Sequence, residues 1–223
     1  MIPRQVTCNK TGCLYYLHNL YECSLITKGL ITGDMLSGEE IKEVLYSVIE
    51  EIGKENIQVN VASHIESSQE YLDIIMNRCI TKLTYELNDN GHGIIIATLG
   101  EALLHFMLTI STLPSERKVE IKNDLSLDIV IPSLPSLLRD PNKSIIIQII
   151  KDKKTDLTKV ENLEFVQPNA QNIWLISTRP LSIANYTEYS IFTKHRSRRY
   201  SNVIIDIDKF LKSMKDKSFR FVP

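Results

Sequence analysis

The sheet of this protein is predicted from the stretch Leu125-Ser126-Leu127-Asp128-Ile129-Val130-Ile131, in which an apolar residue stands at every second position. This alternation is typical of a β-strand with one buried face. The shorter run Val119-Glu120-Ile121 precedes it, and Asn123-Asp124, residue types favoured in turns, lies between the two. Together the runs predict a β-hairpin.

Downstream of the hairpin, strand patterns alternate with helix patterns. Apolar runs rich in β-branched residues predict further strands over residues 144–150, 173–177, 186–192 and 203–207. Helices are predicted near residues 156–165 and over 208–215. Strands that alternate with helices favour parallel pairing.

Upstream of the hairpin, residues 94–97 read Ile-Ile-Ile-Ala, a continuous apolar run that predicts a strand buried on both faces. Residues 101–111 follow with apolar side chains almost all round a helix, which predicts a helix buried on several sides. A strand that leads into a buried helix indicates parallel α/β packing. The fold class predicted is therefore α/β, with a mixed, largely parallel sheet of five to seven strands and flanking helices.

Two further helices are predicted from capping boxes near the N-terminal end of this domain. Ser37 with Glu40 begins an amphipathic helix that Gly53 ends, and Ser67 with Glu70 begins a second that runs to about residue 87. Residues 57–61 alternate between them like a short strand. We divide the chain into an N-terminal segment rich in Cys and Tyr, residues 1–33, and a single α/β domain, residues 34–223.

The composition excludes several classes of protein. The 223 residues are 43% hydrophobic and 24% charged with a net charge of -1, values typical of a globular chain without a strong overall field. The four cysteines are too few for a disulfide-framework protein, and no secretory signal is present. No apolar run approaches the roughly 18 residues of a membrane span. We therefore expect a cytoplasmic protein without a membrane partner.

Four potential zinc ligands stand at equal spacing near the N-terminus: Cys8, Cys13, His18 and Cys23. Three thiolates and one imidazole form a known tetrahedral structural site. The last three residues resemble the C-x4-H-x4-C part of a zinc knuckle, although a knuckle has two residues in the first interval and this chain has four. The resemblance implies a structural zinc. Two alternatives stay open, a Cys8–Cys13 redox pair and an amphipathic helix on which the ligands would diverge.

Two of the predicted strands carry a second candidate site, formed by Asp128, Gln148 and Lys151. An acid on one strand, followed on the next by Gln148 and a lysine, resembles the PD-(D/E)xK nucleases. In that family these side chains bind magnesium and polarise water, so the resemblance implies a metal-dependent nuclease. Here Gln148 is neutral, and because strand residues alternate, Lys151 points to the opposite face.

The densest positive charge lies between two predicted strands, in the residues Lys194, His195, Arg196, Arg198, Arg199 and Tyr200. Arginines form bidentate contacts with phosphate oxygens, and a tyrosine can stack on a base. This segment predicts a nucleic-acid contact. The alternative is a solvated loop balanced by nearby acids such as Asp206.

The leading functional hypothesis from these patterns is a non-enzymatic nucleic-acid-associated or assembly protein that uses the basic segment. The first alternative is a divergent or inactive PD-(D/E)xK-like nuclease with Asp128, Gln148 and Lys151 as its remnants. The second is a subunit that docks on a partner protein and makes no nucleic-acid contact.

Overall fold

The computed structural model describes residues 36–83, 92–121, 125–193 and 198–218. The helices are α2 (Gly38–Ile52), α3 (Lys54–Ser63), α4 (Ser67–Leu83), α5 (His92–Ile110), α6 (Leu134–Arg139), α7 (Lys153–Leu163) and α8 (Val203–Ser218). The strands are β1 (Glu116–Ile121), β2 (Leu125–Ile131), β3 (Ile145–Ile150), β4 (Ile173–Ser177), β5 (Thr187–Ser190) and β6 (Arg198–Arg199). Short 3-10 turns are η1 (Pro141–Lys143), η2 (Ala170–Asn172) and η3 (Tyr200–Asn202).

The strands form one six-stranded sheet in the order β1-β2-β3-β4-β5-β6. β1, β2 and β3 pair antiparallel, whereas β3, β4, β5 and β6 pair parallel. The predicted hairpin is β1 and β2, and α7 is the helix that connects the parallel strands β3 and β4. The prediction of an α/β fold with a mixed, mostly parallel sheet is confirmed.

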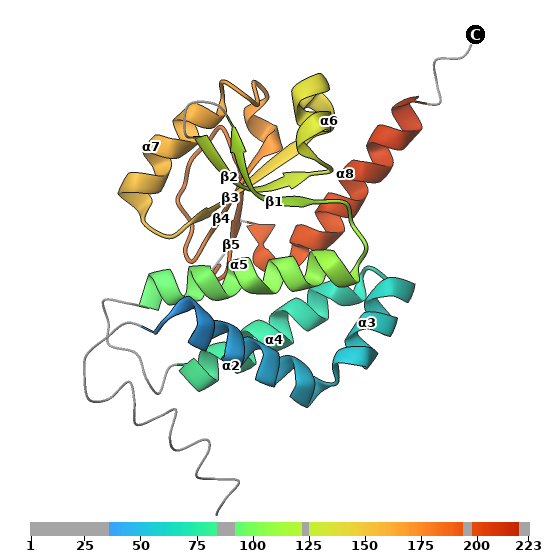
Figure 1. Cartoon of the computed structure of the whole chain (residues 1–223), viewed down its shortest axis with the longest axis vertical. Coiled ribbons are helices and arrows are strands. Elements are labelled where there is room, and N and C mark those ends of the chain that lie inside the picture. The colour runs from blue at the N-terminus through green and yellow to red at the C-terminus, as the bar shows by residue number, and fades with distance from the viewer. Residues whose placement is uncertain (1–35, 84–91, 122–124, 194–197, 219–223) are drawn as a thin grey trace, which may run out of the picture. The chain divides into compact units, whose positions relative to one another are not determined.

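Helices cover both faces of the sheet (Figure 1). On one face, Val160 and Leu163 of α7 join the core cluster that includes Ile146 and Ile150 of β3. Because side chains alternate along a strand, Ile147 and Ile149 face the other way, towards α5. Figure 1 shows α5 between the sheet and the layer of α2, α3 and α4. This central position of α5 brings it close to the end of β3.

The start of β3 is held by one buried side chain, that of Gln167, which is fully buried. Its Nε2 donates to the carbonyl oxygens of Pro141 and Ser144 at 2.8 and 2.9 Å. Its Oε1 accepts from the backbone N–H of Asn169 at 3.2 Å. One amide therefore ties the segment after α7 to the turn that leads into β3.

The strand predicted over residues 94–97 is wrong, because these residues lie in the first turns of α5. Ile95, Ile96 and Ala97 are all buried. A helix that is covered on most sides needs apolar residues in succession, and such a run reads like a buried strand. Burial by neighbouring elements overrides the weak preference of isoleucine for strands.

Residues 57–61 also form a helix, α3, and not the predicted strand. Ile57 and Val61 are buried, and a spacing of four residues fits one helical turn. Val59 separates the two readings, because a strand would bury it beside Ile57, and it is 64% exposed. The alternation in the sequence was therefore accidental.

The last predicted strand, residues 203–207, is the first part of α8. Val203, Ile204 and Ile207 are buried, which is the spacing of one face of a helix. α8 continues through the helix that was predicted from residue 208. The six strands of the sheet thus end at β6 in the described part of the chain.

α5 is also a longer apolar element than the sequence pattern suggested. It has 19 residues and is apolar enough to cross a membrane by length and composition alone. However, 61% of this stretch is buried inside the protein, as in the core helix of a globular domain. It also carries a buried carboxylate, that of Glu101.

Candidate functional site

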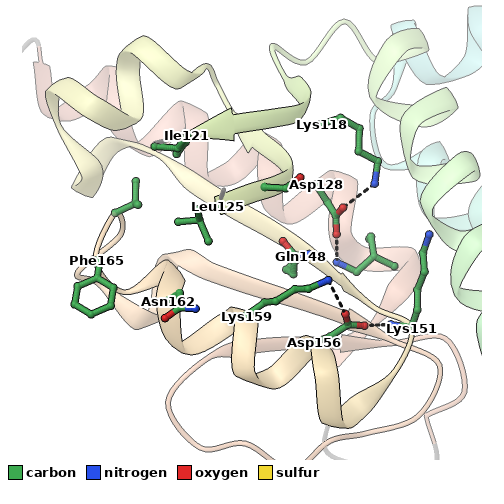
Figure 2. A pocket seen from close by; sticks show the side chains of 13 residues that line it. Lys118, Ile121, Leu125, Asp128, Gln148, Lys151, Asp156, Lys159, Asn162 and Phe165 are labelled. Atoms are coloured by element: carbon green, nitrogen blue, oxygen red, sulfur yellow. Dashed lines mark hydrogen bonds and ion pairs between the residues drawn. The ribbon is translucent and has the colours of Figure 1, made fainter. Parts of the chain in front are cut away.

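A cavity of about 860 Å³ opens beside α7, where β3 ends and the antiparallel strand β2 begins. Figure 2 shows the polar side chains that point into it. The residues that line it are Lys118, Ile121, Leu125, Ser126, Asp128, Gln148, Ile149, Lys151, Asp156, Lys159, Asn162, Phe165 and Val166. The three residues predicted from the nuclease resemblance, Asp128, Gln148 and Lys151, are all among them.

Asp128 lies at the point where β2 and β3 part. The last backbone pair between these strands is Ile129 with Ile147. One residue further, the Asp128 Oδ2 accepts from the backbone N–H of Ile149 at 2.8 Å (Figure 2). The carboxylate thus takes the place of a backbone carbonyl and holds the strand ends at a fixed separation.

Glu101 brings a second carboxylate to the same place from α5, with its side chain only 9% exposed. Its Oε1 lies 2.6 Å from Nζ of Lys118 and 3.9 Å from Nη2 of Arg117. Its Oε2 lies 2.8 Å from Nζ of Lys151. A buried glutamate needs such partners, because desolvation of an unpaired charge is costly.

Lys118 joins the two carboxylates. Its Nζ lies 2.6 Å from Oε1 of Glu101 and 2.7 Å from Oδ1 of Asp128. The backbone of Lys118 has a φ of 49°, in the left-handed region that residues with a Cβ seldom occupy. Such a conformation costs about 1 kcal/mol or more and clusters at functional sites. The strain therefore singles out Lys118 within β1.

These contacts shift the proton affinities of both partners. Burial alone would raise the pKa of Glu101, but hydrogen bonds and charges from Lys118 and Lys151 outweigh it and hold the pKa below its usual value. Burial alone would lower the pKa of Lys118, yet its bonds to Asp128 and Glu101 raise it. Glu101 is therefore ionised and Lys118 charged at neutral pH.

The lowered pKa of Glu101 predicts a loss of stability in acid. A carboxyl whose pKa is lower in the folded state stabilises the fold above its unfolded pKa, and this contribution is lost as the pH falls through the folded value. We expect Glu101→Gln to lower the free energy of unfolding by about 2 kcal/mol at neutral pH, because the charged hydrogen bonds are lost but their lysine donors are partly exposed. Urea unfolding from about pH 7 to about pH 3 should show a shallower pH dependence for the variant. An identical dependence in both proteins would contradict this assignment.

Gln148 and Lys151 leave β3 on different sides, as the alternation of the strand predicted. Gln148 faces the cavity, and its Oε1 is buried without a hydrogen bond from any described residue. The side chain of Lys151 runs instead towards α5 and Glu101. The cluster forms nevertheless, because α5 reaches the end of the sheet and meets Lys151 there.

Asp156, near the start of α7, fixes the backbone beside Lys151. Its Oδ2 accepts from the N–H of Lys151 at 2.7 Å (Figure 2). The same oxygen accepts from the N–H of Asp152 at 2.8 Å. Its Oδ1 lies 3.7 Å from Nζ of Lys159. Asp156 thus bonds from inside α7 back to the two N–H groups that precede the helix, and so positions Lys151.

The donor set fits a magnesium or manganese ion. Within residues 36–83, 92–121, 125–193 and 198–218, no group of three or more His, Cys, Asp or Glu side chains is arranged to hold a metal. Mg²⁺, however, is commonly held by one or two carboxylates together with phosphate oxygens of the substrate and water. The Glu101 and Asp128 oxygens both lie within 2.7 Å of one ammonium nitrogen, so they converge closely enough to share a cation.

The described part of the basic segment lies at the same carboxyl-terminal edge of the parallel strands as the cavity, in β6, three strands away from β3. Arg198 lies over the ring of Tyr189, 5.8 Å from its centroid, and its Nη1 donates to the hydroxyl of Tyr189 at 3.4 Å. Arg199 is exposed and lines a second cavity, of about 870 Å³, together with Arg179. Lys194, His195 and Arg196 lie outside the described residues, so their predicted contact with nucleic acid stays a prediction.

Tyr200 does not have the position that stacking on a base requires. Its side chain is buried at 3% exposure, and its hydroxyl donates to the carbonyl oxygen of Gly100 at 2.7 Å. The ring also lies where a Cβ on Gly100 would come within 3.9 Å of it. The stacking role predicted for Tyr200 is wrong, and its ring instead packs the basic end of the sheet against α5.

The four N-terminal residues Cys8, Cys13, His18 and Cys23 lie outside the described residues, and the structural zinc stays a prediction. The fourth cysteine of the sequence, Cys79, is buried in α4 with a free thiol. Burial raises its pKa to about 12, as expected of a thiol that fills core volume.

Two residues of the cluster were missed from the sequence, Glu101 and Lys118. A charged residue in the middle of the apolar run 94–110 was the available signal for Glu101, since a buried glutamate must be paired. Lys118 gave no such signal, because a lysine on a hairpin is usually solvated. Its role depends on the register of β1 against β2, which places it opposite Asp128.

No family model and no curated protein sequence matches this chain. Solved structures are similar to it in fold, among them two complexes with DNA. One is described as restriction endonuclease PspGI in a complex with substrate DNA, at 12% identity and a TM-score of 0.54, covering 78% of this chain and 93% of the other. The second is metal-depleted Ecl18kI with uncleaved, modified DNA, at 9% identity and a TM-score of 0.53, covering 86% and 84%. This chain therefore has the same fold as these two proteins.

Proposed function

We propose that this protein is a divalent-metal-dependent DNA endonuclease with its active site at Glu101, Asp128 and Lys151. The observation that carries the proposal is that two carboxylates converge on one cation position near the end of β3. They are those of Glu101, from α5, and Asp128, from β2. The likeness to two proteins whose structures contain DNA, one of them a restriction endonuclease, supports DNA as the substrate and favours the nuclease alternative over the leading hypothesis.

Glu101 and Asp128 would hold the metal ion, with phosphate oxygens of the substrate and water as its remaining ligands. A bound magnesium or manganese ion supplies a Lewis acid for the phosphate and a more acidic water molecule. The burial of both carboxylates strengthens their electrostatic interaction with a cation, because the local dielectric constant is lower than that of water.

Lys151 and Gln148 would act on the substrate and on water. The Nζ of Lys151 lies 2.8 Å from Oε2 of Glu101, next to the cation position, where it can hold a phosphate oxygen. Gln148 lines the same cavity, and its Oε1, which is buried and bonded to none of the described residues, would accept a hydrogen bond from a water molecule that enters beside it. Asp156 keeps the backbone of Lys151 in place and has no direct role in the reaction.

The DNA would follow the edge of the sheet at which the parallel strands end. Lys151 follows β3, Arg179 follows β4, and Arg199 ends β6, so all three lie at this edge. Three strand spacings separate β3 from β6, roughly 14 Å. A row of cations over this distance matches several successive phosphates of one strand.

The test is a cleavage assay on the full-length protein with long DNA of mixed sequence. We expect cleavage with magnesium or manganese and none with calcium or a chelator, with Asp128→Asn as the inactive control.

A second experiment measures DNA binding in the presence of a chelator, so that no cleavage occurs. The double variant Arg179→Ala/Arg199→Ala should bind DNA more weakly, and its slope of log affinity against log salt should fall by about one per arginine.

The outcomes separate the functional hypotheses. DNA binding without cleavage under any metal would support the non-enzymatic nucleic-acid-binding protein instead. Neither binding nor cleavage, together with a stoichiometric protein partner on purification, would support the docking subunit. An unchanged salt slope in the double variant would remove Arg179 and Arg199 from the DNA path.

A further inference from the structure

We infer that Lys118 is an internal counter-ion that occupies the metal position, so that a divalent cation binds only after the Lys118 ammonium has left the carboxylates. The inference deepens the proposed function and rests on it for the identity of the metal site. It concerns a step before catalysis, the loading of the site.

The distances make the two cations mutually exclusive. The Nζ of Lys118 lies 2.6 Å from Oε1 of Glu101 and 2.7 Å from Oδ1 of Asp128, so it occupies the space between the two oxygens. A magnesium ion needs oxygen ligands at about 2.0 to 2.1 Å and therefore needs the same space. Two positive charges at this separation would also repel each other strongly.

The lysine is the member of this cluster that can move. Its side chain is 53% exposed, whereas those of Glu101 and Asp128 are 9% and 13% exposed. The Asp128 carboxylate is fixed further by the N–H of Ile149. The left-handed backbone conformation of Lys118 is strained, so little conformational energy opposes a change of backbone conformation at this residue.

The net charge of the cluster gives a reason for the Lys118 ammonium to leave the two carboxylates. Three cations, Arg117, Lys118 and Lys151, surround two carboxylates in the free protein, which leaves one positive charge in excess. A divalent cation added to this cluster would meet net repulsion. A DNA phosphate offers the Lys118 ammonium a new anionic partner and lowers this repulsion at the same time. Metal binding is therefore coupled to the arrival of the substrate.

The experiment measures Mn²⁺ affinity of the full-length protein by isothermal titration calorimetry, without DNA. We expect weak binding by the wild type and at least about tenfold tighter binding by Lys118→Met, because the competing charge is gone. Lys118→Gln, which keeps a hydrogen-bond donor, serves as a second neutral variant if the methionine variant is poorly folded by circular dichroism. Lys118→Arg retains the charge and should bind as weakly as the wild type.

Two controls identify the site. Lys159→Met removes the same charge from the same cavity, but its ammonium is paired with Asp156 and not with the two carboxylates, so it should leave Mn²⁺ affinity within about threefold. Asp128→Asn combined with Lys118→Met should abolish the gain. A noncleavable phosphorothioate duplex should tighten Mn²⁺ binding to the wild type and have little effect on Lys118→Met.

The result distinguishes this inference from the proposed function. Equal Mn²⁺ affinity in the wild type and in both neutral variants overturns the counter-ion role, even if the wild type cleaves DNA. A gain in affinity without any cleavage by wild type or variant would support the counter-ion role and contradict the nuclease assignment.

Discussion

Replacing Asp128 with asparagine should lower the rate of DNA cleavage at least about a hundredfold, the scale of losing one preorganised charge in an active site. Asparagine has the same shape and can still accept the hydrogen bond from the Ile149 N–H, so the ends of β2 and β3 should keep their separation. The loss would therefore report on the charge. A single-turnover cleavage assay with Mn²⁺ measures it.

The matched control is Asp140→Asn, the same substitution at a carboxylate outside the cavity. Among the described residues, the side chain of Asp140 makes an i,i+3 ion pair with Lys143, and pairs of this exposed kind contribute little. It should cleave DNA at the rate of the wild type. If Asp128→Asn retained full activity while DNA binding was unchanged, the active site would have to lie elsewhere in the protein.

The largest loss of stability that we expect from a polar residue is for Gln167→Leu. The leucine would leave the buried carbonyl group of Ser144 without the Gln167 donor, and would remove one bond each from the Pro141 carbonyl, which keeps the N–H of Ser144, and from the N–H of Asn169. An unsatisfied buried group costs about 1 to 3 kcal/mol and each further lost hydrogen bond about 1 kcal/mol, so the free energy of unfolding should fall by about 3 kcal/mol. Denaturation in urea, followed by circular dichroism, measures the change.

Gln171→Leu is the control for that substitution. Gln171 is exposed, and its Nε2 donates to the carbonyl of Asn185 at 2.8 Å. Water can replace this bond, so the loss should stay within about 1 kcal/mol. Equal effects of the two substitutions would mean that the burial of Gln167 does not govern the position of β3.

The sequence predicted those elements well whose pattern depends on local chemistry. Ser37 and Glu40 form the capping box expected of them, and α2 begins at Gly38 and ends at Ile52 before Gly53. The hairpin was also predicted, because its two strands and its turn are close in the chain. Such features need no knowledge of what packs against them.

The elements that were wrong are those whose pattern is decided by tertiary burial. The run at Ile94–Ala97 is apolar because α5 is covered by the sheet on one side and by α2 and α4 on the other. A helix in such a place loses the polar face that identifies an amphipathic helix. In α3 the error came from an exposed apolar residue. Val59 completed an apolar–polar alternation that is typical of a strand, although the segment is a helix.

Only part of the candidate site was predicted from the sequence. Asp128, Gln148 and Lys151 were recognised because they lie on adjacent strands in an order that resembles a known family. Glu101 and Lys118 could not be added, because their contacts depend on the approach of α5 to the end of the sheet and on the pairing of β1 with β2. Both are relations between elements that no local pattern encodes.

Because the Asp128 carboxylate accepts a hydrogen bond from the Ile149 N–H, the amide proton of Ile149 should respond to metal binding at that carboxylate. A cation that replaces the Lys118 ammonium at Oδ1 changes the charge distribution of the carboxylate, and with it the hydrogen bond from Oδ2 to that N–H at the end of β3. The chemical shift or the hydrogen-exchange rate of the Ile149 amide would therefore report whether the metal site is occupied, even when the ion itself gives no spectroscopic signal. Magnesium, which has no colour and no unpaired electron, could in this way be followed inside the protein without any label at the metal.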